Sequence, residues 1–214
     1  TRRSSDLLLE RRPEIKLLFL VGSCPSEVIK LDLHRAAERL AQRFQPDVRI
    51  LDYSGSGIET TFTQGEDACL AALVPELRTS ATAAVDLLVI GALADVVEDQ
   101  FRRTFDAIGL SNVGFLPPRR ADALPAIGPH TRYLLAQPFL TDTAKALDTR
   151  GARHVPAPFP LGIEGTTGWL RAAAEACGID RATVDTVTAP AVTRARRALE
   201  RYRDRLAGKR IFFF

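Results

Sequence analysis

The chain has 214 residues, of which 46% are hydrophobic and 26% are charged. This composition is typical of a globular protein and excludes a disordered or fibrous chain. The net charge is only +3, and basic and acidic residues are interspersed, which does not favour a nucleic-acid-binding role. No apolar run approaches the roughly 20 residues that a membrane-spanning helix needs. We therefore expect one or two globular domains with no membrane span.

Three cysteines, Cys24, Cys69 and Cys177, occur without regular spacing. This number and spacing argue against a disulfide framework and favour a reducing cytoplasm. The Arg- and Ala-rich, Lys-poor composition suggests a bacterial source. Methionine is absent, and the apolar run at residues 211–214 has no turn or cap after it. We expect an internal piece of a longer protein, truncated at both ends.

Short apolar runs alternate along the chain with longer amphipathic patterns. Strands are expected at residues 16–21, 48–53, 86–90, 113–116, 133–136 and 211–214. Their continuous apolar character is typical of strands buried on both faces of a parallel sheet. Helices are expected at residues 26–44, 66–77, 96–108, 141–149, 166–177 and 192–206.

Gly109, Gly151 and Gly178 each stand just after a helical pattern, where a left-handed cap is needed. The alternation of strands and helices predicts an α/β fold with layered, Rossmann-like parallel-sheet domains. Four prolines between residues 117 and 129 suggest a boundary. We expect a first α/β domain at residues 1–117 and a second, incomplete one at 118–214.

The first candidate site is the segment GSCPSEVI at residues 22–29, which directly follows the first strong strand. Ligands of open α/β sheets gather at the carboxyl ends of strands. Ser23 or Ser26 could cap the following helix, and a helix N-terminus favours the thiolate form of a cysteine such as Cys24. The thiolate could bind a metal or act as a nucleophile. The alternative is a small buried cysteine that fills the turn.

The second candidate site is the polar segment at residues 53–67, which also follows a strand and precedes a helix. It lacks the lysine of a phosphate-binding loop and does not complete a G-x-G-x-x-G motif. Long polar loops at strand ends are uncommon without a role. We therefore prefer contact with a ligand or a partner chain over nucleotide binding or a plain connection.

Other features have simpler explanations. Six arginines between residues 194 and 205 are interpreted as the solvated face of a helix, because Glu200 and Asp204 are interspersed among them. Thr166 or Thr167 could cap the helix that follows a rigid turn. Cys69 and Cys177 lie within helical patterns and are expected to be core residues.

Several long motifs together carry a family resemblance. They are KLLFLVGSCPSEVIKLDL (16–33), YSGSGIETTFTQGEDACLAALVPEL (53–77), GALADVVEDQF (91–101), FLPPRR (115–120), LLAQPFL (134–140) and APFPLGIEGTTGWL (157–170). Over nearly its whole length the chain resembles the N subunits of light-independent (dark-operative) protochlorophyllide reductases. Nitrogenase molybdenum–iron proteins and chlorophyllide reductases are the more distant relatives. The resemblance implies domains of the nitrogenase component 1 type.

The resemblance also implies a function. Enzymes of this family reduce one pyrrole-ring double bond of protochlorophyllide to give chlorophyllide, in chlorophyll and bacteriochlorophyll biosynthesis. An L-protein homodimer hydrolyses ATP and delivers electrons to an N2B2 heterotetramer. Each N–B half holds one 4Fe-4S cluster, ligated by three N-subunit cysteines and a B-subunit aspartate. Cys24 matches the third of these cysteines, and the first two belong to sequence before Thr1.

The resemblance implies no catalytic acid or base in this chain. The aromatic and small residues after the second strand could form an apolar wall for the pigment, which gives Tyr53, Ser54, Gly55, Thr61 and Phe62 as candidate substrate contacts. The chain alone is expected to be inactive, since one matched cysteine cannot hold a cluster. Alternatives are a chlorophyllide reductase subunit or a non-catalytic, nitrogenase-like scaffold subunit.

Overall fold

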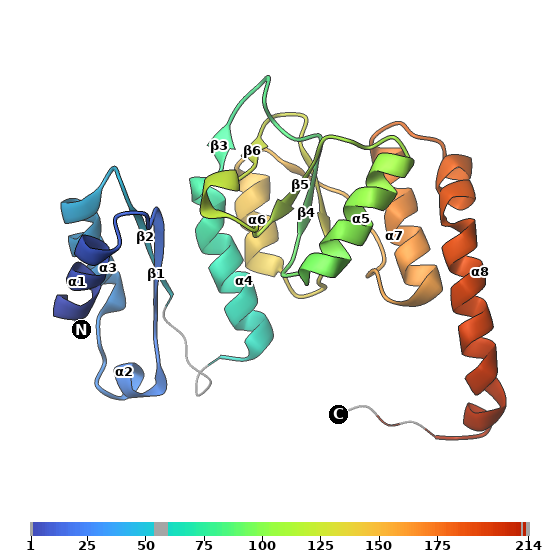
Figure 1. Ribbon diagram of the computed structural model, residues 1–214, viewed down its shortest axis with the longest axis horizontal. Helices are drawn as coiled ribbons and strands as arrows, with labels where there is room; N and C mark the ends of the chain where they lie inside the picture. Colours follow the sequence, from blue (N-terminus) through green and yellow to red (C-terminus); the bar gives the residue numbers. More distant parts are fainter. Residues whose placement is uncertain (1, 54–59, 211, 213–214) are drawn as a thin grey trace. The chain divides into compact units, whose positions relative to one another are not determined.

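The computed structural model describes residues 2–53, 60–210 and 212 and divides the chain into two compact units (Figure 1). The first unit comprises Thr1–Ala92 and Gly114–His154, and the second comprises Leu93–Val113 and Val155–Phe214. Both units are therefore discontinuous in sequence. The expected domain boundary between residues 117 and 118 stays a prediction.

The larger sheet has four strands in the order β5-β4-β7-β8. β4 (Leu87–Ile90) pairs in parallel with β7 (Arg132–Leu135), and β7 pairs in parallel with β8 (Arg153–His154). β5 (Val113–Leu116) is the other neighbour of β4. All four side chains of β4 are fully buried. The expectation of a parallel-sheet α/β fold with buried central strands is therefore confirmed.

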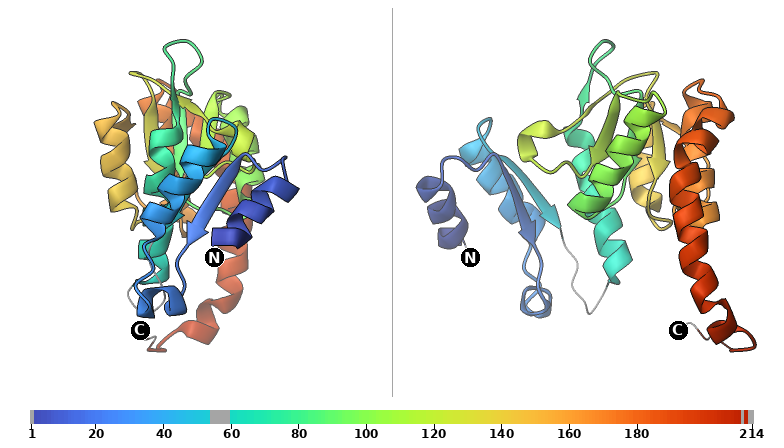
Figure 2. Two further views of the ribbon diagram at one scale, coloured as in Figure 1. Left: turned by 90° about the vertical axis from the view of Figure 1, so that its left-hand side faces the viewer. Right: turned by 45° about the vertical axis from the view of Figure 1, so that its right-hand side comes forward.

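Two helices cover this sheet within the first unit. α4 (Phe62–Leu73) continues into the short helix η1 (Val74–Glu76) and packs beside α6 (Thr141–Thr149), as the left-hand view of Figure 2 shows (α4 teal, α6 yellow). Their apolar faces join β4 and β7 in one core. The short strands β3 (Arg78–Thr79) and β6 (Ala126–Ile127) pair nearby, and η2 spans Ala121–Ala123.

A separate two-stranded parallel sheet is formed by β1 (Leu17–Val21) and β2 (Arg49–Tyr53). α1 (Arg2–Arg11) and α3 (Leu33–Phe44) supply Leu9, Ala37 and Leu40 to its core. The expectation that β1 is buried on both faces is wrong for the described residues. Its first four side chains are half-buried and Val21 is exposed, because β1 has β2 as its one neighbouring strand there.

The prediction of a single helix at residues 26–44 is also wrong. The structure has a short α2 (Cys24–Val28), a break, and then α3. Lys30 lies in the break with a φ of 50°, in the left-handed region that helices of L-residues do not continue through. Asp32 then caps α3 by accepting a hydrogen bond from the Arg35 backbone N–H at 2.8 Å.

The second unit packs α5 (Asp95–Ala107), α7 (Gly162–Ala176) and α8 (Arg181–Leu206) around aromatic rings. The fully buried Trp169 of α7 lies 4.8 Å from Phe101 and 5.7 Å from Phe105, measured between ring centroids. Thr166 and Thr167 lie inside α7 and not at its start, so neither caps it. The φ angles of Gly109, Gly151 and Gly178 are 91°, 86° and 79°. These values confirm the left-handed conformation expected at all three helix ends.

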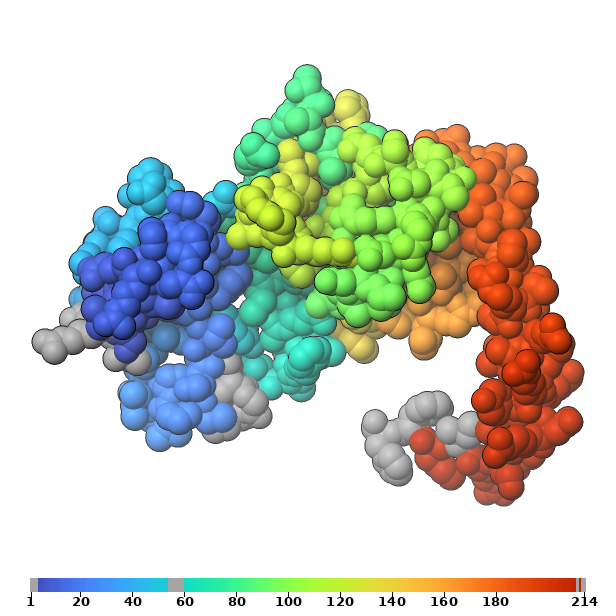
Figure 3. Space-filling model, viewed as in Figure 1, coloured from blue at the N-terminus to red at the C-terminus, as the bar shows by residue number. Residues whose placement is uncertain are grey.

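α8 begins eleven residues before the helix expected at 192–206, at Arg181, because Asp180 caps it and Pro190 is accommodated within it. The six arginines between residues 194 and 205 are all exposed, which confirms their interpretation as a solvated helix face (red in Figure 3). Among the described residues, no helix combines the length and apolar character needed to cross a bilayer.

Candidate functional site

Cys24 is the first residue of α2 and follows the carboxyl end of β1. Its side chain is exposed, so the alternative of a buried cysteine filling the turn does not hold. Ser23 and Ser26 fix the turn around it. The Ser23 backbone N–H donates to Ser26 Oγ at 2.6 Å, and Ser26 Oγ donates to the Ser23 carbonyl at 2.7 Å. The thiol is therefore held at a strand end and faces outward.

The three cysteines lie in different elements of the structure. Cys69 lies within α4 and Cys177 at the end of α7, both partly buried, so the expectation that they are core residues is met only in part. Burial raises the pKa of the Cys69 thiol, which disfavours its thiolate form. Across the described ranges, no group of three or more His, Cys, Asp or Glu side chains is placed to hold a metal ion. The exposed thiol of Cys24 is suited to be one ligand of an iron–sulfur cluster. The described residues do not provide a complete set of ligands around it.

The second candidate segment follows the carboxyl end of β2, and Cys24 follows that of β1. The two strand ends are adjacent, since Val21 and Tyr53 are register partners. Of the candidate contacts, Ser54 and Gly55 lie outside the described residues. The Tyr53 hydroxyl lies 3.2 Å from Thr60 Oγ1. A Cβ at Gly65 would lie 3.0 Å from that hydroxyl, so glycine permits the close approach of Tyr53 to α4.

Thr61 and Phe62 begin α4, four residues earlier than the sequence pattern predicts. Thr61 is the N-cap residue, and Gln64 completes a capping box by accepting from the Thr61 backbone N–H at 2.8 Å. The Phe62 side chain is 86% exposed. The large aromatic side chain of Phe62 is thus exposed on a well-capped helical turn and is not part of the core.

Four large apolar side chains on the segments that end β1 and α2 and begin α4 are exposed. Val21 ends β1, Val28 and Ile29 close α2, and Phe62 opens α4. All four are more than half exposed, at 59%, 75%, 70% and 86%. Val21, Val28 and Ile29, which lie near Cys24 in the sequence, are thus not covered by the described residues.

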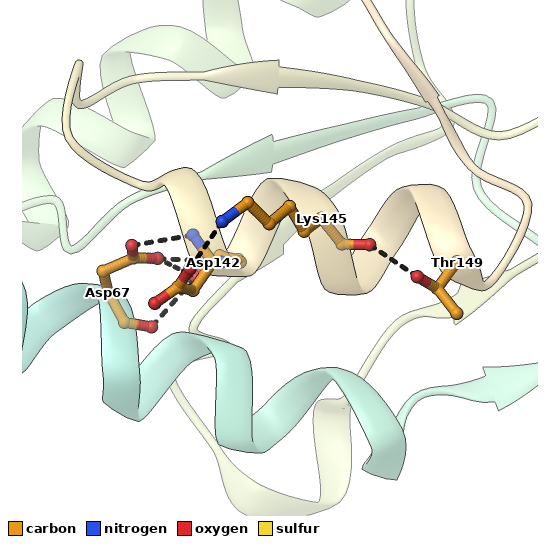
Figure 4. A network of polar contacts seen from close by, with 5 residues as sticks. Asp67, Asp142, Lys145 and Thr149 are labelled. Atoms are coloured by element: carbon orange, nitrogen blue, oxygen red, sulfur yellow. Dashed lines mark hydrogen bonds and ion pairs between the residues drawn. The ribbon is translucent and has the colours of Figure 1, made fainter.

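Asp67 belongs to the polar segment 53–67, for which we expect contact with a ligand or a partner chain, but in the structure its side chain contacts α6. It is buried in α4 and caps the first turn of α6, 75 residues along the chain (Figure 4). Its carboxylate accepts from the backbone N–H groups of Asp142 and Thr143, both at 2.8 Å. The Thr143 hydroxyl lies 2.7 Å from the same carboxylate. No local sequence pattern signals such a cap.

Glu66, the neighbour of Asp67, ties α4 to the connection after β4. Its Oε1 accepts from the Ala92 backbone N–H at 2.8 Å. The adjacent carboxylates of Glu66 and Asp67 therefore hold two segments that follow strands of the larger sheet. Glu66 belongs to the candidate segment 53–67, but the sequence does not indicate this contact, because the partner lies 26 residues away.

His34 forms a further polar cluster beside β2. Its Nδ1 lies 3.2 Å from the Asp52 carboxylate, and its Nε2 lies 3.5 Å from that of Glu38. The hydrogen bond and charge of Asp52, followed by the charge of Glu38, raise the pKa of His34 above 6.5. The pair links α3 to the end of β2, one residue before Tyr53.

The comparisons with known proteins agree with this architecture. Residues 8–214 match the family described as nitrogenase component 1 type oxidoreductase. A solved structure titled nitrogenase Cp1 at pH 6.5 has the same fold, with a TM-score of 0.62 and 14% identity over 84% of this chain and 45% of that one. At this identity the likeness concerns the fold alone.

Curated relatives are much more similar in sequence. A light-independent protochlorophyllide reductase subunit N from Rhodopseudomonas palustris (strain TIE-1) is 68% identical over 97% of this chain. The protein of the same name from Bradyrhizobium sp. (strain ORS 278) is 70% identical over the same share. The chain spans about half the length of these relatives, 48% and 49%. On the match of residues 8–214, together with the parallel-sheet fold, this chain belongs to the nitrogenase component 1 type oxidoreductases.

Proposed function

We propose that this chain is part of an N subunit of light-independent protochlorophyllide reductase, working in the bacterial cytoplasm. The observation that carries the proposal is the identity of 68–70% over 97% of the chain to relatives of that name. In this proposal the enzyme reduces a pyrrole-ring double bond of protochlorophyllide. The subunit acts in an N2B2 heterotetramer with a B subunit, and an L-protein homodimer hydrolyses ATP and supplies electrons.

Within this function, Cys24 is proposed as one ligand of a 4Fe-4S cluster shared with the B subunit. Thiolates are the usual ligands of such clusters, and the exposed position of Cys24 at a strand end is open to a partner chain. The cluster supplies single-electron transfer when bound. The Ser23–Ser26 hydrogen bonds hold the backbone on either side of the thiol, so the ligand would be preorganised.

For the pigment, we propose contacts with Tyr53, Ser54, Gly55, Thr61 and Phe62. A planar, apolar ligand needs an apolar wall with few polar anchors. Phe62 would offer apolar surface, and the Tyr53 and Thr61 hydroxyl groups would offer polar ones. The capping box and the hydrogen bonds of Glu66 and Asp67 keep the first turns of α4 fixed. Pigment binding would therefore lose little free energy to ordering the backbone that carries Phe62.

The test of the ligand role is Cys24→Ser in the full-length subunit, purified with its B partner. A hydroxyl is a poor iron ligand, so we expect a loss of iron content and of pigment reduction. Cys69→Ser is the matched control, because it makes the same chemical change at a partly buried cysteine inside α4 that is not proposed as a ligand. A Cys24→Ser complex with full iron content and turnover would refute the assignment.

The test of the pigment role is Phe62→Asp in the same complex. We expect at least a ~10-fold weaker affinity for protochlorophyllide in a fluorescence titration, since a carboxylate replaces apolar contact area. Thr63→Asp places the same charge on the neighbouring exposed residue and should leave the affinity nearly unchanged. Unaltered affinity in a folded Phe62→Asp complex would remove Phe62 from the site. Preference for chlorophyllide over protochlorophyllide in parallel assays would instead indicate a chlorophyllide reductase.

A further inference from the structure

Three strands of the larger sheet end at one edge, where their backbones are joined by hydrogen bonds. The Gly91 N–H, just after β4, donates to the Leu116 carbonyl of β5 at 2.9 Å. The Ala136 N–H, just after β7, donates to the Ile90 carbonyl of β4 at 2.8 Å. The chain leaves β4 for β5 on one side, whereas β7 lies on the other side of β4. β4 and β7 therefore flank the switch point of this sheet, and open α/β sheets bind ligands at the carboxyl edge of that point.

Gln137, the second residue after β7, packs closely against the end of β4. A Cβ at Gly91 would lie 2.9 Å from Gln137 Cγ, so a larger residue at position 91 would displace the glutamine. Gly91 also has a φ of 140°, in the region that favours glycine. Glycine at this position therefore lets the Gln137 side chain lie directly against the backbone at the switch point.

The side-chain amide of Gln137 is not used by the fold. Gln137 is half-buried, and its side chain makes no hydrogen bond among the residues that the structure describes. A half-buried amide loses hydration without gaining a partner, so a ligand atom that accepts from it would gain binding free energy. The Phe139 side chain, two residues further on, is 62% exposed. A hydrogen-bond donor and an exposed aromatic side chain therefore follow β7 in close succession.

The charges at this edge favour a neutral ligand group over an anion. The first N–H groups of α6 are already bound to the Asp67 carboxylate, so they are not open to an anion. The Glu66 carboxylate also lies beside the edge, where it accepts from the Ala92 N–H. Residues 90–92 and 136–141 carry no basic side chain. A ligand carboxylate or phosphate would be repelled by the two protein carboxylates, whereas a carbonyl oxygen carries no net charge.

Glu66 also connects this edge to the proposed pigment contacts. It lies one helical turn after Phe62 on α4, and its hydrogen bond to Ala92 fixes that turn beside Gly91. One turn of helix spans about 5.4 Å, which is less than the width of a four-ring pigment. A pigment that contacts Phe62 can therefore also reach the switch point.

We propose that the Gln137 amide donates a hydrogen bond to a neutral carbonyl oxygen at the rim of the pigment, and that Phe139 packs on the apolar surface of the pigment. This inference rests on the proposed function and extends the pigment site to the switch point of the larger sheet. Protochlorophyllide carries neutral keto and ester carbonyls as well as a charged propionate, and the charges at this edge select a carbonyl. One directional anchor of this kind fixes the orientation of an otherwise apolar ligand.

Gln137→Leu in the full-length subunit, purified with its B partner, removes the donor. We expect a ~10-fold weaker affinity for protochlorophyllide in a fluorescence titration. Gln137→Glu keeps the size of the side chain, so it tests the same donor even where leucine prevents assembly, and it should weaken the affinity at least as much. Gln42→Leu makes the first change at an exposed residue of α3 and should leave the affinity unaltered.

Resonance Raman spectra of the bound pigment separate hydrogen bonding from a merely structural role. A hydrogen bond lowers the stretching frequency of a carbonyl, so we expect the carbonyl band to move to higher wavenumber in both Gln137 variants. Unchanged affinity, or weaker binding with the band at its wild-type position, would overturn the inference. If Phe62→Asp still weakens binding in the same assay, the proposed function survives that result. A wild-type complex that does not bind protochlorophyllide would overturn both.

Discussion

Replacing Asp67 by alanine should open the start of α6. The change removes the acceptor of two backbone N–H groups, at Asp142 and Thr143, and of the Thr143 hydroxyl. Each hydrogen bond to a charged group contributes about 1.5–3 kcal/mol, and a lost N-cap costs about 1 kcal/mol. Because the bonds share one carboxylate and are not additive, we expect about 3 kcal/mol in total.

At 1.4 kcal/mol per factor of ten, this loss predicts a rise of roughly 100-fold in hydrogen exchange over the first turns of α6. The measurement is hydrogen exchange of a peptide covering residues 141–149 in the full-length subunit. Asp142→Ala is the control, because it leaves the Asp67 bonds in place and removes the exposed Lys145 pair at 3.2 Å and a carboxylate in the first turn of α6, each of which contributes about 1 kcal/mol or less. If Asp67→Ala accelerates exchange no more than this control does, the capping argument is wrong.

Two other contacts give further predictions. Arg150 donates to the carbonyls of Val74 and Pro75 in η1 and of Leu77 just after it. Arg150→Met should therefore lower the free energy of unfolding by about 2 kcal/mol, measured by urea denaturation of the full-length subunit. A loss below ~0.5 kcal/mol would show that water replaces these bonds. For His34, the pKa raised above 6.5 means that its pair with Asp52 stabilises the α3–β2 contact fully below pH 6.5 and is lost as the pH rises through the raised pKa. An NMR titration should show the His34 pKa falling in Asp52→Asn, and an unchanged value would contradict the pairing.

Features set by neighbouring residues could be predicted from the sequence. The continuous apolar run LLVI became the buried strand β4, and the pattern at residues 141–149 became α6 with the same bounds. Gly151 ends α6 in the left-handed conformation expected of it. The position of Cys24 at a strand end also followed from local pattern, since the strand and the turn residues are contiguous.

Features that depend on distant residues were decided by the tertiary structure. Asp67 looked like part of a polar loop because its partners lie 75 and 76 residues away in α6. The apolar composition of β1 predicts a strand buried on both faces, but its side chains are only partly buried. The actual burial depends on which strands and helices surround the strand, and these are distant in sequence. The sequence by itself determined the α/β alternation and the cysteine motif, because hydrophobic periodicity and turn chemistry act over a few residues. Only the tertiary structure decided which side chains of the candidate site face outward and which are held by α4, because those contacts join segments far apart in the chain.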